Sequence, residues 1–440
     1  VLAAAGASVG LGNIWRFPYL AAKYGGGIFL IIYIVLALTF GYTMIVAETA
    51  IGRMTRKSPV GAFKSFGKKK WLSFGGWINA VIPVLIVPYY SVIGGWVIKY
   101  LVEYFRGNAK LLAEDGYFTD FISNGVSTEL CFVAFCAFTL IIIFAGVQNG
   151  IERVSKIMMP ILIVLSVIIA VYSVTRPGAL EGVKYFLVPN VKNFSWMTVV
   201  AAMGQMFYSL SIAMGILITF GSYMKKDTAI EDSTRNVEIF DTGIAIMAGL
   251  MIIPAVFAFS GGDPDTLQAG PSLMFITIPK VFQNMGFGTV IGIVFFLLVL
   301  FAAVTSSIAL TESAVSTFED ELGWGRKKAT VLVGVIMLAL GSLSSLGYGP
   351  LAGIKIIGMQ FLDLFDFLTN SVMMPIAALL TSLFVSRVVG IDKIEAEIIH
   401  GESAFRRKKV FVVMIKYLCP VFAIIILLSS VANALGWIKM

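Results

Sequence analysis

The stretch GASVGLGNIWRFP, residues 6–18, lies inside an apolar segment and is unusual for one. Its glycines, among them Gly6 and Gly10, weaken a helix and permit backbone dihedrals that other residues avoid. Asn13 adds a polar amide and Arg16 adds a full charge. Close packing of Gly6 and Gly10 against another helix would explain the glycines but not the amide and the charge. The stretch therefore predicts a helix that is interrupted inside a membrane.

A second apolar segment has a matching interruption. The sequence QMFYSLSIAMG, residues 205–215, places the hydroxyls of Ser209 and Ser211 and a glycine in the middle of a predicted span. The two segments are five spans apart, and corresponding interruptions in two halves of a chain are typical of transporters that bind substrate on discontinuous helices. A break exposes carbonyl oxygens that can bind a hard cation, and its new helix N-terminus can hold a carboxylate.

A third polar feature is a run of three hydroxyls in another apolar segment, Thr305, Ser306 and Ser307. Such hydroxyls often donate to carbonyls of their own helix. Beside two interrupted helices, they also fit an oxygen-lined cation site.

The composition agrees with a membrane protein. Hydrophobic residues make up 58% of the 440 residues and charged residues 13%, with a mean hydropathy of +0.91, whereas soluble chains have about 25% charged residues. This excludes a soluble enzyme, a disordered scaffold and a secreted disulfide-rich domain, and it argues against a membrane barrel. The apolar stretches predict eleven spanning helices of about 20 residues. With His400 as the only histidine, most histidine-based catalysis and zinc chemistry are excluded.

The distribution of positive charge predicts the orientation. About 21 of the lysines and arginines fall in the predicted inner loops and about 8 outside, which predicts a cytoplasmic N-terminus and an extracellular C-terminus in the cell's inner (plasma) membrane. The net charge of +8 is therefore assigned to these loops and not to nucleic-acid binding. The outer stretch 261–288 is apolar around residues 273–276, so we expect it to pack back onto the helices as a lid or to lie on the membrane surface.

Residues 6–18 strongly resemble the first-helix signature of the neurotransmitter:sodium symporters, in particular the bacterial branch with the LeuT fold. The resemblance covers nearly the whole chain. It extends to Pro88-Tyr89-Tyr90, Asp241-Thr242 and residues 362–367. It implies an all-α polytopic membrane protein that forms a single transporter domain. Two inverted repeats of five helices, residues 1–175 and 198–387, would each begin with a broken helix, and an eleventh helix, residues 410–435, would follow.

The family resemblance implies two sodium sites and a substrate site. One sodium site would use Gly6, Val9, Ala302, Thr305 and Ser306. The other would use Ser8, Asn13, Ser209, Asp241 and the substrate carboxylate. The substrate site would comprise Ala7, Gly10, Gly12, Ile86, Tyr90, Tyr208, Ser209, Ser211, Ala213, Met214, Ser307 and Leu310. Tyr90 would bind the carboxylate through its hydroxyl.

Two features of these sites refine the expected transport. Asp241 aligns with, or next to, a position that is asparagine in LeuT-like relatives. Chloride-dependent members of the family need an anion nearby, and the Asp241 carboxylate would supply that charge and make chloride unnecessary. The alternative is that Asp241 is an ordinary helix-capping aspartate. Monoamine carriers hold the amine with an acid at the position of Ala7, so a neutral amino acid is favoured, with a large hydrophobic or aromatic side chain.

The resemblance also implies gates. Arg16 and Asp366 would form the outer pair with Tyr208 as the lid, while Asp320, supported by Tyr223, would pair on the inner side with an arginine that precedes Val1. Glu48 and Glu312 are intramembrane acids, for which function is the default hypothesis and a structural hydrogen-bond role the alternative. A proton-linked role of Glu312 stays open.

The sequence thus predicts a sodium-coupled symporter that imports a neutral L-amino acid by alternating access. A carrier of the same fold for a betaine or an indole-type solute is the alternative. A channel would need rings of charge or carbonyls from an oligomer, and a membrane-embedded enzyme would need a catalytic pair that the sequence does not contain. A homodimer is left open.

Overall fold

The computed structural model describes residues 8–262 and 270–438. Gly6 and Ala7, which were predicted to bind sodium and substrate, lie outside the described residues. Within the described ranges all regular secondary structure is helical, apart from two isolated β-bridges.

Nine helical segments of the described chain are long and apolar enough to cross a membrane. They are Gly27–Thr55 (α3, η2, α4), Lys70–Phe105 (α6), Gly125–Phe144 (α9), Val147–Val174 (η3, α10), Ile230–Ser260 (α14), Gly288–Leu322 (α16), Arg326–Leu346 (α17), Phe361–Val389 (α18, η7, α19, η8) and Lys408–Ala434 (α21, η9, α22). The two other predicted spans are the interrupted ones, whose helical pieces are shorter.

The two predicted interruptions are present. In the first span, residues 9–10 form a bend, and the π-helix η1 (Gly12–Arg16) and α2 (Phe17–Lys23) follow it. The second span comprises α12 (Trp196–Ser209) and α13 (Ile216–Tyr223), separated by residues 210–215. Ser211 and Ala213 have φ angles of 55° and 59°. The left-handed region is unfavourable for non-glycine residues and cannot continue a right-handed helix.

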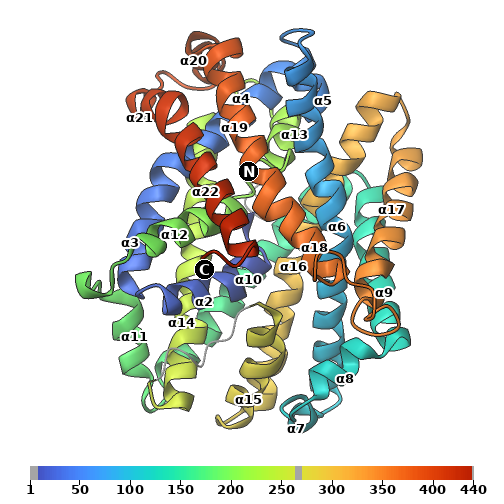
Figure 1. The fold of residues 1–440 in the computed structure, drawn as a ribbon, viewed down its shortest axis with the longest axis vertical. Helices are drawn as coiled ribbons and strands as arrows, with labels where there is room; N and C mark the ends of the chain where they lie inside the picture. Colours follow the sequence, from blue (N-terminus) through green and yellow to red (C-terminus); the bar gives the residue numbers. More distant parts are fainter. Residues whose placement is uncertain (1–7, 263–269, 439–440) are drawn as a thin grey trace.

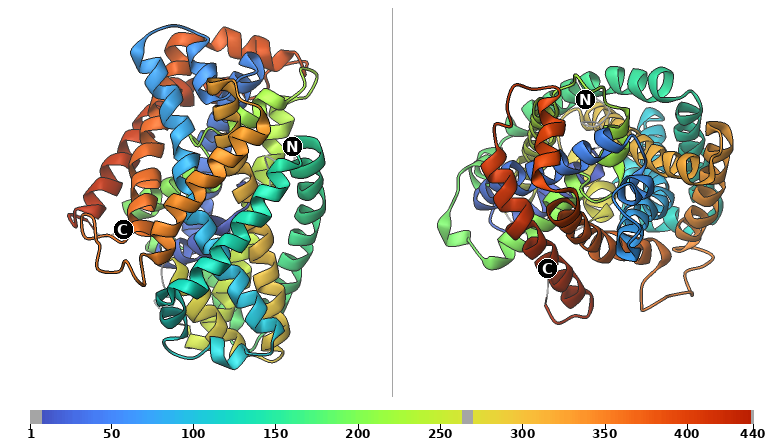
Figure 2. Two further views of the ribbon diagram at one scale, coloured as in Figure 1. Left: turned by 90° about the vertical axis from the view of Figure 1, so that its right-hand side faces the viewer. Right: turned by 90° about the horizontal axis from the view of Figure 1, so that it is seen from above.

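The broken helices lie among the long ones. Helix η1 contacts α14 and α12, α13 packs on α4, and α16 packs along α6. Figure 1 shows α20 (Ile391–Ile399) and α21 at one end of the bundle, and α7 (Ala109–Leu112), α8 (Tyr117–Ser123) and α15 (Ile278–Gln283) at the other. Helix α22 lies at the periphery in both views of Figure 2.

The remaining short helices belong to the connections. They are α5 (Pro59–Lys64), α11 (Ala179–Leu187), η4 (Val191–Asn193) and η6 (Leu273–Thr277).

The apolar outer stretch packs back onto the helices. Leu273, Met274 and Phe275 of η6 are buried, and the Tyr100 hydroxyl donates to the Phe275 carbonyl at 2.8 Å. The Phe275 ring stacks on Phe118, with ring centroids 5.1 Å apart. The expectation of a packed loop is confirmed for the described part of this stretch, and a loop lying on the membrane surface is excluded there.

Helix α14 corrects one prediction. The sequence pattern placed Asp241 at the start of its span, but α14 begins at Ile230, so Asp241 lies in the helix interior. An aspartate so far from the first turn cannot cap the helix N-terminus. The capping alternative is therefore wrong, because the mostly polar residues 230–238 extend the helix beyond its apolar part.

Candidate functional site

Asn13, Ser209 and Asp241 form one buried polar cluster, although three different segments contribute them. The Asn13 amide nitrogen donates to Asp241 Oδ1 at 2.8 Å and to Ser209 Oγ at 2.9 Å. Ser209 Oγ donates to the same Asp241 oxygen at 2.5 Å. The amide oxygen of Asn13, Oδ1, accepts the Gly10 N–H at 3.1 Å, and this bond stabilises the bend of the first span. The structure thus brings together three residues of the predicted second sodium site.

Two residues that the sequence did not point to complete this cluster. The Tyr33 hydroxyl of α3 donates to Asp241 Oδ2 at 2.6 Å, and the Gln205 amide nitrogen donates to the Gly12 carbonyl at 3.1 Å. Tyr33 and Asp241 are both fully buried. Each carboxyl oxygen of Asp241 therefore has a hydrogen-bond donor, and this acidic side chain lies beside the bend of the first span.

The residues of the other predicted sodium site converge between the first span and α16. Ser306 Oγ donates to the Val9 carbonyl at 3.1 Å, across the two segments. Thr305 Oγ1 lies 3.1 Å from the Ala302 carbonyl and 3.0 Å from the Phe301 carbonyl, so it also makes the local bonds that hydroxyls favour within helices. These neutral oxygens suit a hard monovalent cation.

A small cavity of about 30 Å³ lies between the two breaks. Its lining includes, of the predicted substrate residues, Gly10, Gly12, Ile86, Tyr90, Tyr208, Ser209, Ser211, Met214 and Leu310, and it adds Leu11 and Ile216. The Tyr90 hydroxyl accepts the Leu11 N–H at 3.3 Å. Helical periodicity alone did not indicate the two added residues, because both look like ordinary apolar positions.

Glycine is required at both cavity positions of the first span. A Cβ at Gly12 would lie 2.4 Å from the Tyr208 ring, and one at Gly10 would lie 2.5 Å from Ser306 Oγ. Tyr208 therefore closes directly over the backbone of the first break.

Two residues that were predicted to bind substrate do not line the central cavity. Ser307 lies outside the cavity lining, and its Oγ is 3.2 Å from Thr139 Oγ1 of α9. Ala213 likewise lies outside the lining, and its N–H donates to Glu48 Oε1 at 2.8 Å. Glu48 thus supports the break in the second span.

The predicted outer gate residues face a wider cavity of about 540 Å³, which Arg16, Tyr208 and Asp366 all line. The Arg16 guanidinium lies 5.2 Å from the centre of the Tyr208 ring, a cation–π distance. Asp366 accepts from Asn370 Nδ2 at 2.6 Å and from the Tyr89 hydroxyl at 3.2 Å. Among the described ion pairs there is none between Arg16 and Asp366, so this closing contact stays a prediction.

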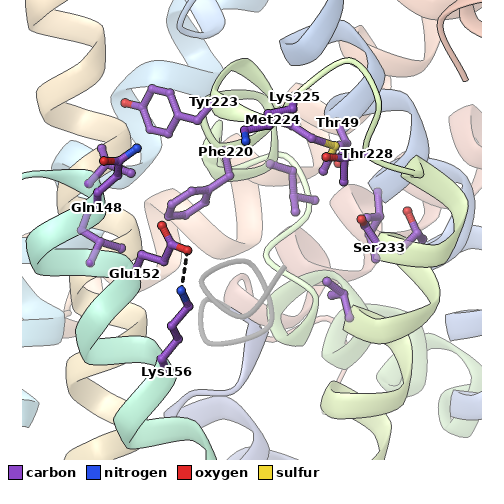
Figure 3. Close-up of a pocket in the computed structure, with 17 residues that line it drawn as sticks. Thr49, Gln148, Glu152, Lys156, Phe220, Tyr223, Met224, Lys225, Thr228 and Ser233 are labelled. Carbon is purple, nitrogen blue, oxygen red and sulfur yellow. Dashed lines mark ion pairs between the residues drawn. The ribbon is translucent and has the colours of Figure 1, made fainter. Parts of the chain in front are cut away.

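On the opposite side, a cavity of about 710 Å³ opens between α4, α10, α13 and α14. Figure 3 shows Tyr223, Phe220 and Met224 on one side of it and the Glu152–Lys156 ion pair on another. Asp320, the predicted inner gate acid, accepts the Ser58 N–H at 2.6 Å.

The buried acid Glu312 belongs to an ion pair. Arg326 of α17 donates to its two oxygens at 3.1 and 2.6 Å, and the Tyr223 hydroxyl donates at 2.7 Å. Tyr223 was predicted to support Asp320, but its hydroxyl bonds Glu312. This arrangement favours the structural alternative for Glu312 over proton transport, since its charge is already matched.

Two interrupted membrane helices, with two oxygen clusters beside a cavity between them, define a secondary transporter. The chain matches the Sodium:neurotransmitter symporter family over residues 1–113 and 118–437 and belongs to that family.

Individual relatives agree with this assignment. The sodium-dependent transporter YhdH of Bacillus subtilis (strain 168) is 35% identical over 435 residues, which cover 98% of this chain and 96% of that protein. The human sodium- and chloride-dependent GABA transporter 2 is 27% identical over 89% of this chain and 72% of its own length.

Among solved structures, MhsT in complex with L-phenylalanine is similar, with a TM-score of 0.86 and 36% sequence identity, covering 98% of this chain and 97% of that one. The predicted LeuT fold is confirmed, as are the family and the assignment as a multi-pass, sodium-dependent transporter rather than an enzyme.

Proposed function

We propose that this protein imports a neutral L-amino acid with a large hydrophobic or aromatic side chain, driven by sodium and by alternating access. The observation that carries the proposal is the described lining of the central cavity, which combines apolar side chains with hydroxyls and contains neither aspartate nor glutamate. Such a lining offers no partner to a charged amine on a substrate side chain. The relative MhsT was crystallised with L-phenylalanine, which supports the same class.

Two sodium ions are proposed. The neutral oxygens of Val9, Ala302, Thr305 and Ser306, together with Gly6, would hold one ion. Asn13, Ser209, Asp241 and Ser8 would hold the other, next to the substrate carboxylate at Tyr90. The hydrogen bonds between Asn13, Ser209 and Asp241 support the second assignment, because they already bring the polar atoms of these three buried side chains together.

Chloride is proposed to be unnecessary. Asp241 supplies a buried negative charge that Tyr33, Asn13 and Ser209 all contact. A mobile anion in the same place would have to bind against this carboxylate, and like charges in a low dielectric repel strongly.

The assembly and orientation also remain proposals. Residues 1–175 and 198–387 would form the inverted repeats and residues 410–435 the extra helix, with the N-terminus in the cytoplasm, the C-terminus outside the inner membrane and an open possibility of a homodimer. Arg16 and Asp366 would close the outer side over bound substrate, and Asp320 would close the inner side.

Reconstituted uptake tests the proposal. Labelled amino acids, with all twenty as competitors, are measured in proteoliposomes with and without a sodium gradient, for Asn13→Ala and Thr305→Ala. Both variants should lose sodium-stimulated uptake, because each removes a proposed sodium ligand. Thr311→Ala is the matched control: this buried threonine lies on the same helix as Thr305 and, within the described residues, its hydroxyl donates to the Ser307 carbonyl of its own helix at 2.7 Å.

Unchanged uptake in both ligand variants would refute the site assignment. Competition by betaines or indoles but by no amino acid would instead favour the alternative solute class.

A further inference from the structure

A groove of about 510 Å³ runs along the membrane-facing side of α9 and reaches the end of α17. Its apolar walls are Val126, Leu130, Val133, Leu346 and Pro350. Val126 and Leu130 are 74% and 67% exposed in the protein alone, as expected for side chains that contact lipid. Apolar exposure of this kind does not by itself specify an occupant.

The groove contains one acid, Glu129. Its Oε1 accepts a hydrogen bond from the Ser342 hydroxyl of α17. Its Oε2 is buried and has no hydrogen-bond donor in the described part of the chain. The ion pairs found among the described residues do not include Glu129 either. A carboxylate oxygen in such surroundings is costly unless a donor reaches it from outside the chain.

The depth of Glu129 limits what that donor is. Glu129 follows the first residue of α9 by four positions, and Ser342 precedes the last residue of α17 by four. At 1.5 Å per residue both lie about 6 Å from their helix ends. With the ends of these two helices at the membrane boundary, Glu129 would lie where lipid headgroups meet acyl chains, so a headgroup could reach the carboxylate while a chain lies along the groove.

We propose that this groove binds a phospholipid whose headgroup carries a primary ammonium, such as phosphatidylethanolamine. A rotation of the Glu129 carboxylate turns Oε2 toward the groove, where the ammonium donates to it, and one acyl chain packs along Val126 and Leu130. A choline headgroup has no N–H to donate, and a glycerol headgroup leaves the phosphate charge unbalanced beside the carboxylate. The site is independent of the proposed substrate and sodium sites, and uptake assays do not test it.

Native mass spectrometry of the purified protein tests the proposal. The protein is mixed with equal amounts of dioleoyl phosphatidylethanolamine and dioleoyl phosphatidylcholine, and the ratio of bound lipids is measured. Wild type should prefer the ethanolamine lipid about tenfold, since one charge-assisted hydrogen bond in an apolar groove is at stake. The N-monomethyl and N,N-dimethyl lipids should be retained at intermediate ratios, because each still donates an N–H.

Two variants locate the preference. Glu129→Gln should bring the ratio close to one. Glu181→Gln, which removes an exposed acid on α11, should leave it unchanged. Ser342→Ala keeps the carboxylate and should keep or increase the preference, so the reasoning can still be tested if the Glu129 variant does not fold.

Three results would overturn the proposal. Equal retention of the two lipids by wild type would show that the amine is not recognised. A preference that survives in Glu129→Gln would place the lipid elsewhere. Preferential retention of phosphatidylglycerol, or a lipid-free dimer that dissociates in Glu129→Gln, would assign the groove to an anionic lipid or to a second copy.

Discussion

Replacing Asp241 by asparagine should make transport depend on chloride and weaken sodium binding. The asparagine keeps the size of the side chain and one oxygen that can face Asn13 and Ser209. It removes the fixed negative charge that the Tyr33 hydroxyl, 2.6 Å away, helps to orient. Because Asp241 is fully buried, no water replaces the lost charge at low cost.

The size of the effect follows from the position of this carboxylate. A unit charge about 4 Å from a cation contributes about 4 kcal/mol at an effective dielectric constant of about 20. The remaining neutral oxygens retain part of the binding energy. We therefore expect the sodium concentration for half-maximal uptake to rise at least about tenfold, which corresponds to about 1.4 kcal/mol.

The assay is uptake of a labelled amino acid into proteoliposomes, titrated with sodium in chloride or in gluconate. Wild type should give the same curve with either anion, whereas Asp241→Asn should recover only in chloride. Asp232→Asn on the same helix is the control, because its ion pair with Arg406 is exposed to solvent. A chloride requirement in wild type, or an unchanged sodium curve in the asparagine variant, would refute the reasoning.

Three further changes test the rest of the site. Glu312→Gln should destabilise the protein by about 3 kcal/mol, because it removes the closer ionic partner of Arg326 and leaves only Glu319, 3.9 Å away, among the described residues; thermal unfolding in detergent measures this, and Glu312→Gln combined with Arg326→Met should recover part of the loss. Gly12→Ala should abolish uptake, since the new Cβ would lie 2.4 Å from the Tyr208 ring. Normal uptake by Gly12→Ala would argue against this clash. Ala213→Gly should stabilise the protein by about 1 kcal/mol, because glycine adopts the φ of 59° without strain; a lower unfolding temperature would contradict this.

The sequence predicted the interruptions well because they depend on local chemistry. Glycines, hydroxyls and an amide inside apolar segments are visible without any knowledge of distant contacts. The same information placed Asn13, Ser209 and Asp241 in one site through the family resemblance. It failed for Tyr33, which lies in the apolar run GIFLIIYIVL and contacts a residue 208 positions away.

The three hydroxyls of α16 show a second limit of prediction from sequence. Successive residues of a helix project about 100° apart, so Thr305, Ser306 and Ser307 cannot all face one site. Ser306 faces the Val9 carbonyl, whereas Ser307 faces Thr139 on the other side of the helix. Only the packing of the neighbouring helices decides which hydroxyl faces the break.

The buried polar side chains and the helix breaks depend on each other. A break leaves backbone N–H groups without helical acceptors in a low dielectric, where each unsatisfied group costs several kcal/mol. In this protein the Gly10 N–H is met by Asn13, the Leu11 N–H by Tyr90 and the Ala213 N–H by Glu48. Asn13 and Tyr90 therefore have two tasks, since they stabilise the unwound backbone and also lie at the proposed ion and substrate sites, whereas Glu48 supports the backbone of the second break. A substrate carboxylate that takes the Leu11 N–H would release the Tyr90 hydroxyl, which can then donate to the same carboxylate. Binding would in this way exchange one set of satisfied bonds for another without leaving a buried group unpaired.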